Sequence, residues 1–300
     1  MELDVRRLRI LREVALRGTV TAAAGSLGYT PSAISQQLSA LERESGVTLL
    51  ERAGRRVRLT DAGQVLVQRT EPVLVALEEA QAALEESRDS ITGELRIAAA
   101  GSIARALVIP MAARIAAARP ALRATVLECE TGDAMRELLL GHLDVVVAHE
   151  YSGSEGRPPD GAARVDLFTE DMCIAVPAGQ RAAPVDLAAL AGAVWAAEPP
   201  QSTCGQATRA ACRAAGFDPD IRYVSSEPGV LLSAVRCAGA VALLPRLAVA
   251  EPPPGVDVLP VAGAGIRRLV YAAHRRGSAS RPGIALVLAS LKAAAAELSR

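Results

Sequence analysis

A short polar helix face near the N-terminus carries the side chains best suited to specific recognition. Thr30 and Pro31 predict the start of a helix, because Thr is a good N-cap and Pro needs no N–H at the first helical position. Ser32, Ser35 and Gln36 then put short hydrogen-bonding groups on one face, with no acid in the first two turns. Such a face suits the major groove of DNA, where Gln can pair bidentately with adenine.

A second group of suitable side chains follows in the segment Arg52-Ala53-Gly54-Arg55-Arg56-Val57-Arg58-Leu59. Four arginines around a Gly-centred turn predict a hairpin wing that grips phosphates by charge. Residues 1–60 hold ten Arg and six acidic residues, a net +4, while the whole chain is neutral, so residues 61–300 carry −4. A basic head on an acidic body is the charge distribution expected of a nucleic-acid-binding protein.

Three short helices are predicted to position these side chains, because apolar residues recur at offsets of three and four. The stripe members are Leu8, Leu11 and Ala15, then Ala23, Ala24 and Leu27, then Ile34, Leu38 and Leu41. Thr21 is the predicted N-cap of the second helix, and Gly28 ends it because Gly readily adopts a positive φ. The order of elements indicates a DNA-binding head; the alternative is a small Ala-rich helical domain with scattered Arg.

The run AAAGSLGYTPSAISQQLSALERESGVTLLERAGRRVRLTDAG resembles the N-terminal signature of LysR-type transcriptional regulators. The resemblance implies a multidomain chain: an all-α-rich winged helix-turn-helix domain over 1–60, then an α/β domain of two lobes, similar to periplasmic solute-binding proteins. It implies that bases or nearby phosphates face Thr30, Pro31, Ser32, Ser35 and Gln36. It also implies that the DNA backbone is held by Arg52, Arg55, Arg56 and Arg58.

Residues 61–90 predict a long linker helix with an apolar stripe. Its members are Leu66, Val73, Leu77, Ala80 and Leu84. A stripe this long favours a partner helix, and the resemblance implies dimerisation through it. The alternative is packing on the chain's own C-terminal domain. Pro72 predicts a kink or break, because proline removes a backbone bond and crowds the carbonyl of Gln68.

From residue 91 the sequence alternates predicted strands and helices, which favours a mostly parallel sheet with helices on both faces. The predicted strands are 94–100, 123–128, 143–148, 172–176, 194–197, 221–224, 240–243 and 268–273, and the helices include 103–118, 133–140 and 283–299. By resemblance, lobe I covers about 91–163 and 267–300, and lobe II about 164–266.

A cleft is predicted where strands lead into helices, because free amides and hydroxyls at such points can hold a carboxylate or similar anion. The effector-binding candidates are Ser102, Thr131, Gln201, Ser202, Thr203, Ser225 and Ser226. For any single one of them, plain helix capping is the competing interpretation.

The five cysteines suggest neither a disulfide framework nor a metal site, because their number is odd and there is no Cys-x-x-Cys pair. Cys204 lies at a predicted helix N-terminus, where a thiolate is favoured, and Cys212 follows eight residues later. The resembled family includes peroxide sensors with two cysteines in this lobe; the alternative is two buried thiols. No cofactor is indicated. No apolar run approaches the roughly 20 residues that span a bilayer, so we expect a cytoplasmic protein.

The function predicted from these features is sequence-specific DNA binding modulated by a small, possibly anionic effector in the cleft between the lobes. The expected partners are double-stranded DNA with a dyad operator, a second copy or a tetramer of the chain, and possibly RNA polymerase. The alternatives are a cysteine-based redox regulator, a solute-binding module with a vestigial head, and an enzyme. No nucleophile elbow, phosphate loop or dinucleotide fingerprint supports the enzyme.

Overall fold

The computed structural model describes residues 3–53, 56–87, 91–153, 156, 158–180, 183–263 and 265–298. The chain forms two compact units, one made of Met1–Arg88 with Arg275–Arg281 and the other of Asp89–His274 with Pro282–Arg300. We call them unit 1 and unit 2 and describe each by itself.

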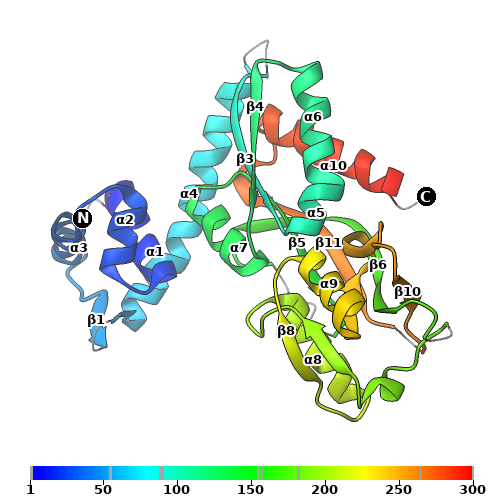
Figure 1. The fold of residues 1–300 in the computed structure, drawn as a ribbon. Helices are drawn as coiled ribbons and strands as arrows, with labels where there is room; N and C mark the ends of the chain where they lie inside the picture. The colour runs from blue at the N-terminus through cyan, green and yellow to red at the C-terminus, as the bar shows by residue number, and fades with distance from the viewer. Residues whose placement is uncertain are drawn as a thin grey trace. The chain divides into compact units, whose positions relative to one another are not determined.

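Unit 1 begins with three helices and a two-stranded wing (Figure 1). The helices are α1 Val5–Arg17, α2 Val20–Leu27 and α3 Pro31–Ser45, and the wing pairs β1 Leu50–Ala53 with β2 Arg56–Leu59 antiparallel. Most of the predicted stripe residues meet in one buried core, namely Leu8, Leu11, Ala23, Ala24, Ile34, Leu38 and Leu41. Burial of one face of each helix therefore forms the winged helix-turn-helix that the sequence predicted.

The helix caps explain where these elements begin and end. Thr30 caps α3 as predicted, its Oγ1 accepting from the Ala33 N–H at 3.2 Å. The predicted cap of α2 is wrong, because Thr19 caps that helix and Thr21 lies inside it. Thr19 has the extended backbone that a capping residue needs. Gly28 ends α2 at φ 68°, a left-handed conformation that favours glycine.

The linker helix α4, Asp61–Glu86, runs through Pro72, so a break there is wrong, while the alternative, a kink, stays a prediction. The two residues directly before Pro72 make side-chain contacts. Thr70 is buried and its hydroxyl donates to the Leu66 carbonyl at 2.8 Å, while Glu71 pairs with Arg12 of α1. The ion pair between Glu71 and Arg12 ties this turn of α4 to α1.

A segment from far along the chain also packs on α4. The short helix η4, Arg276–Ser278, places Gly277 so close that a Cβ there would lie 2.4 Å from the carbonyl oxygen of Val75. On either side, Arg275 pairs with Glu78, and Arg281 Nε lies 3.0 Å from Glu85 Oε2. The contacts group this segment with α4 in unit 1.

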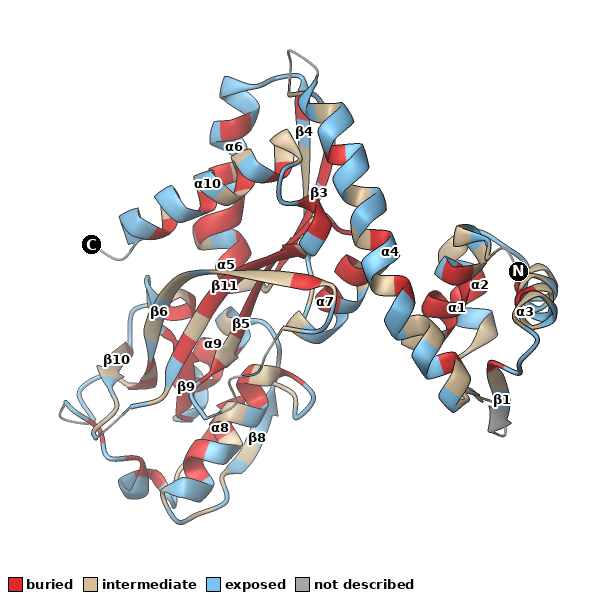
Figure 2. Cartoon of the chain, turned by 180° about the vertical axis from the view of Figure 1, so that it is seen from behind, coloured by how far each residue is buried: buried red, intermediate tan, exposed pale blue. Residues whose placement is uncertain are grey.

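The predicted stripe of α4 divides into two parts. Leu66 packs against the core of the helical head. Val73, Leu77 and Leu84 are exposed by 41%, 37% and 67%, and Ala80 is exposed beside them (Figure 2 shows the exposed surface of α4). The single chain therefore leaves an apolar row on α4 uncovered.

Unit 2 is built on a seven-stranded sheet in the order β10-β6-β11-β5-β3-β4, with β9 also paired to β6. Its strands are β3 Gly93–Ala99, β4 Leu122–Glu128, β5 Val145–Tyr151, β6 Ala162–Pro177, β9 Ala242–Pro245, β10 Val256–Pro260 and β11 Arg267–Arg275. A parallel sheet, β7 Val194–Ala197 with β8 Asp220–Val224, completes the strands of the described segments.

The expectation of a mostly parallel main sheet is wrong for the pairs that the structure describes. β3 pairs parallel with β4 and β5, whereas β11 pairs antiparallel with β5, and β6 pairs antiparallel with β9 and β10. The antiparallel pairs arise from the long strands β6 and β11, along which the chain passes between the lobes (Figure 1). Strand β10 and the first half of β6 were not predicted.

The helices of unit 2 cover two groups of strands. In lobe I, buried residues of α5 Gly101–Ile103, α6 Ile109–Ala118 and α10 Pro282–Leu298 share a core with β3, β5 and β11, while α7 Thr131–Leu140 contacts β5. In lobe II, α8 Thr203–Ala214, α9 Pro228–Ala238 and the short helices η2 Leu187–Leu190 and η3 Arg246–Val249 pack on β6, β7 and β9. Trp195, fully buried, anchors lobe II.

Within the described segments, one helix is long and apolar enough to cross a membrane by length and composition, a run that was not predicted from the sequence. It spans Gly101–Ala118 and joins α5 and α6 through the π-helical turn η1, Ala104–Val108. Its residues Ile103, Leu107 and Met111 lie in the core of lobe I. Core helices of globular domains pass the same test.

Gly205 in α8 tests how tightly lobe II is packed. A Cβ at Gly205 would lie 2.1 Å from the Pro199 carbonyl oxygen, whereas a Cβ at Gly132 in α7 meets nothing within 4 Å. We expect Gly205→Ala to lower the free energy of unfolding of unit 2 by about 1–3 kcal/mol, because the backbone around Pro199 must move. Gly132→Ala should be neutral or stabilising. Urea unfolding followed by Trp195 fluorescence measures both; equal stability of the two variants would contradict this packing.

Candidate functional site

The exposed end of α3 presents the polar residues that the sequence singled out. Thr30, Pro31, Ser32, Ser35 and Gln36 are all exposed, on the side opposite the buried stripe of α3. Thr30 Oγ1 lies 3.0 Å from Ser32 Oγ, and the Ser35 hydroxyl donates to the Pro31 carbonyl at 2.9 Å. Gln36 is the longest of these side chains, so it extends farthest from the helix.

The wing places its arginines on a short antiparallel ribbon. Arg58 is exposed on β2, opposite Glu51 of β1. Arg52 and Arg56 occupy strand positions in β1 and β2, and their side chains lie outside the described part of the structure. Arg55 lies outside the described residues altogether.

Sequence reasoning missed one neighbour of this surface. Tyr29, directly before the cap of α3, is 38% exposed. The Arg6 guanidinium of α1 lies 5.4 Å from the Tyr29 ring centre and donates to the Tyr29 hydroxyl. The sequence signal for Tyr29 was its position, an aromatic residue directly before a predicted helix cap.

A cavity of about 330 Å³ lies between the two lobes of unit 2. Side chains from both lobes line it: Ser102 and Arg105 of lobe I, and Cys204 and Ser226 of lobe II. Of the seven predicted effector-binding residues, only Ser102 and Ser226 are among its lining residues.

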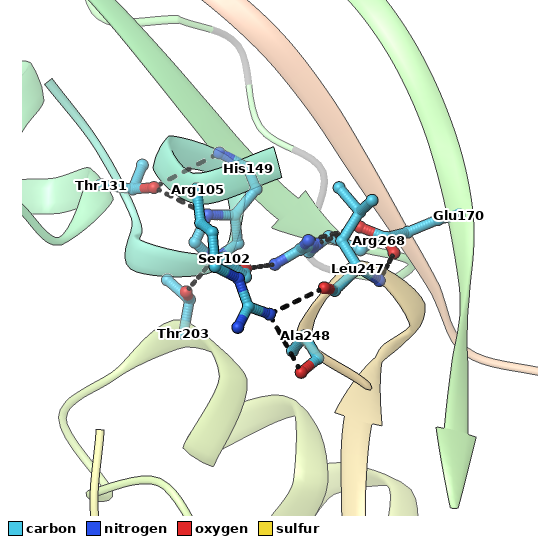
Figure 3. A network of polar contacts seen from close by, with 9 residues as sticks. All are labelled: Ser102, Arg105, Thr131, His149, Glu170, Thr203, Leu247, Ala248 and Arg268. Atoms are coloured by element: carbon cyan, nitrogen blue, oxygen red, sulfur yellow. Dashed lines mark hydrogen bonds and ion pairs between the residues drawn. The ribbon is translucent and has the colours of Figure 1, made fainter. Parts of the chain in front are cut away.

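Thr131 and Thr203 both contact His149, and His149 in turn lines the cavity. The His149 imidazole lies between their hydroxyls, with Nε2 2.8 Å from Thr203 Oγ1 and Nδ1 3.4 Å from Thr131 Oγ1 (Figure 3). The Thr131 hydroxyl also accepts from the His149 backbone N–H at 3.3 Å. Because Thr131 begins α7 and Thr203 begins α8, this contact ties lobe I to lobe II.

His149 is uncharged in this environment. Burial, and next the positive charge of Arg268, lower its pKa from 6.5 to about 3. A neutral imidazole has one donor and one acceptor nitrogen, which matches two hydroxyl partners.

Of the remaining predicted residues, Ser202 and Ser225 bond to the local backbone. Ser202 caps α8, its Oγ accepting from the Gly205 N–H at 2.9 Å and donating to the Pro199 carbonyl at 3.0 Å. Ser225 Oγ accepts from the Glu227 N–H at 3.0 Å. Gln201 is exposed in the turn before α8. For Ser202, the structure therefore confirms helix capping, the competing interpretation that the sequence allowed.

Arg268 of β11 is the main polar residue that the sequence reading missed. Its guanidinium pairs with Glu170 of β6 and donates to Ser102 Oγ at 3.0 Å. The other Glu170 oxygen accepts from the Leu247 N–H at 2.7 Å, so β6, β11, α5 and η3 meet at one ion pair (Figure 3). Nearby, Arg105 donates to the carbonyls of Leu247 and Ala248, at 3.4 Å each.

Carboxylates line the same cavity, contributed by Glu128, Glu130, Glu198 and Glu227. Burial raises the pKa of Glu130, as do the nearby charges of Asp133 and Glu128. Burial also raises the pKa of Glu198, and the charge of Glu130 acts in the same direction. All four lie where a strand ends or a helix begins, so the sequence pointed to these junctions but not to the carboxylates at them.

The thiolate favoured by the sequence at Cys204 is not favoured by the structure. Burial raises the pKa of Cys204 to about 12 and that of Cys212 to about 11. For Cys204, this desolvation outweighs the effect of the helix N-terminus. Within the described residues, no group of three or more His, Cys, Asp or Glu side chains could hold a metal ion.

Comparisons with known proteins cover both units. The family model "Bacterial regulatory helix-turn-helix protein, lysR family" matches residues 5–64, and "LysR substrate binding domain" matches residues 88–296. The chain is 32% identical over 172 residues to a "Probable hydrogen peroxide-inducible genes activator" of Mycobacterium xenopi, covering 57% of this chain and 88% of that protein. It is 28% identical over 287 residues to "DNA-binding transcriptional dual regulator OxyR" of Escherichia coli, covering 93% and 92% of the two chains.

Among solved structures, a full-length OxyR variant from Pseudomonas aeruginosa matches with a TM-score of 0.69 and 20% identity, covering 97% of this chain and 95% of that one. Some other curated relatives match over only about half of their own length.

The neutral His149 predicts a pH dependence of stability. Its pKa of about 3 in the folded chain is below the ordinary 6.5, so the unfolded chain binds the extra proton between these values. Its contribution to stability is therefore full above about pH 6.5 and is lost as the pH falls toward 3. We expect the free energy of unfolding to fall less steeply over this range in His149→Gln, which keeps a donor and an acceptor. Urea unfolding at a series of pH values tests this; parallel profiles would rule out a neutral buried His149.

Proposed function

Because the chain belongs to the LysR family of bacterial regulators, we propose that it binds operator DNA in a sequence-specific way and that a small molecule in the cavity of unit 2 modulates this binding. The observation that carries the proposal is the pairing, in one chain, of an exposed polar recognition helix with a two-lobe domain that encloses a cavity. We propose that the protein acts on chromosomal DNA in the cytoplasm.

The DNA contact rests on the chemistry of α3 and the wing. Ser32, Ser35 and Gln36 are exposed hydrogen-bonding groups that can reach base edges from the N-terminal end of a recognition helix. Arg58 projects from the wing and can pair with phosphate, which adds affinity without sequence information. We assign Thr30 and Pro31 to the same contact, and Arg52, Arg55 and Arg56 to the phosphate contact.

A second copy of the chain is the proposed partner of α4. Val73, Leu77, Ala80 and Leu84 recur at steps of four, three and four residues, which is the seam of a helix pair. Three of them are large and exposed in the single chain. Pairing α4 with α4 of another copy would bury this row and bring two heads to a two-fold symmetric operator.

The cavity supplies the regulatory step. A ligand there contacts residues of both lobes, and the Thr131–His149–Thr203 contact already joins the lobes next to it. A ligand that binds one arrangement of the lobes more tightly shifts the population toward that arrangement. Through the paired heads this shift would alter the spacing and bending of the bound DNA. Contact with RNA polymerase is a further proposed readout.

The alternatives have less support. A redox switch needs a reactive thiolate, and the raised pKa values of Cys204 and Cys212 disfavour it. The two cysteines lie eight residues apart on α8, roughly 12 Å along the axis, too far for a disulfide without unwinding the helix. We propose ligand binding without turnover, because the Thr203 hydroxyl beside His149 is not among the described lining residues of the cavity and the Cys204 thiol is held protonated by burial.

Two substitutions separate base recognition from phosphate contact. Gln36→Ala should reduce the ratio of operator to scrambled-DNA affinity, because it removes a base contact worth about 1–3 kcal/mol. Arg58→Ala should weaken binding to both duplexes equally and lower the salt slope by about 1. Fluorescence anisotropy across a salt series measures both. Arg119→Ala, an exposed Arg in unit 2, is the matched control. Binding by both head variants like that of the parent would show that this surface does not contact DNA.

The α4 row predicts the oligomeric state. Leu77→Glu combined with Leu84→Glu should convert dimers into monomers, because each places a charge in the proposed helix pair. Ala83→Glu adds the same charge at an exposed position of α4 off the row and should leave the dimer intact. Light scattering coupled to size exclusion reports the mass. An unchanged mass for the double variant would place the dimer contact elsewhere.

A further inference from the structure

The cavity between the lobes carries an excess of negative charge. Four carboxylates line it against two guanidinium groups, Arg105 and Arg268. The charge of Arg268 is already balanced, because it pairs with Glu170, and the exposures of the two side chains are only 2% and 8%. Arg105 alone is left to offset the acidic lining residues.

The first turns of α5, α8 and α9, where an anion could bind, are already occupied by the chain's own oxygens. Ser202 Oγ caps α8, and Glu227 Oε1 accepts from the Gly229 N–H at 3.2 Å at the start of α9. At the start of α5, a Cβ on Gly101 would lie 2.7 Å from Glu128 Oε1, so the Glu128 carboxylate lies against this first turn. An anionic ligand would have to displace these groups or bind beside them at an electrostatic cost.

The other titratable groups of the cavity supply no compensating positive charge. His149 is neutral because burial and Arg268 lower its pKa to about 3. Burial keeps the Cys204 thiol and the Tyr151 phenol protonated, which leaves both uncharged. Glu130 is the N-cap residue of α7 but makes no side-chain cap hydrogen bond there, so its carboxylate is available to a ligand.

We propose that the ligand of this cavity is a small organic cation, such as an amine, held by Glu128, Glu130 and Glu198. This inference rests on the proposed function, because it assigns a charge to the small molecule that was proposed to bind in the same cavity. The carboxylates of the lining indicate that charge. The cavity volume of about 330 Å³ is near the lower end of the range for ligand pockets, about 300–1,000 Å³. The ligand is therefore small as well as positively charged.

Three four-carbon probes of matched length test the charge: 1,4-diaminobutane, 1,4-butanediol and succinate. With the full-length chain, we expect 1,4-diaminobutane to raise the melting temperature and to give calorimetric binding, and the diol and succinate to do neither. Glu130→Gln combined with Glu198→Gln should weaken the diamine at least about tenfold, because it removes two of the attracting charges. Glu297→Gln, an exposed residue paired with Arg114 outside the cavity, should bind the diamine like the parent.

Stabilisation by succinate, no binding of the diamine, or equal diamine affinity in the double variant would overturn the proposal. Melting curves without probe show whether the variant is folded, and Glu128→Gln is a second variant if it is not. Operator binding in the absence of probes tests the regulatory function separately. A chain that binds its operator but not the diamine therefore refutes the cationic ligand alone.

Discussion

The ion pair between Arg268 and Glu170 is the contact on which the arrangement of unit 2 depends. It joins β11 to β6, the two long strands along which the chain passes between the lobes, and both side chains are buried. Removal of one partner from such a pair typically costs about 3–5 kcal/mol, because a buried charge is left alone. The same two side chains extend the contact to Ser102 in lobe I and to the Leu247 amide in lobe II. This one pair therefore contacts both lobes at the cavity.

Features that depend on neighbouring residues could be predicted from the sequence, whereas contacts between residues far apart in the chain could not. The head could be read because its stripes, the Thr30 cap and the Gly28 exit lie within a few residues of the groups they position. The cap at Thr19 was missed because Thr19 and Thr21 are both good capping residues, and the backbone conformation decides between them. Arg268 and Glu170 lie 98 residues apart, and no periodicity connects them.

For the cavity, the sequence identified the ends of strands and helices that meet there, and Ser102 and Ser226 among the lining residues, but not the carboxylates beside them. Hydroxyl groups were expected to hold the ligand, yet Ser202 and Ser225 bind the backbone, and Thr131 and Thr203 hold His149. Local hydrogen bonds are the usual fate of Ser and Thr at such positions. Carboxylates reach the cavity from the same junctions, and a strand-end pattern contains no information on which side chains remain unpaired.

The segment Arg275–Arg281 has a mechanical consequence. The chain crosses the boundary between the units three times, after residue 88, after residue 274 and after residue 281. The bond after residue 88 is the covalent link between residues 1–88 and the rest of the chain, so a break there would leave residues 275–281 as the part of unit 1 still joined to unit 2. The two fragments would then be held together by the packing of Gly277 on α4 and by the ion pairs of Arg275 with Glu78 and of Arg281 with Glu85.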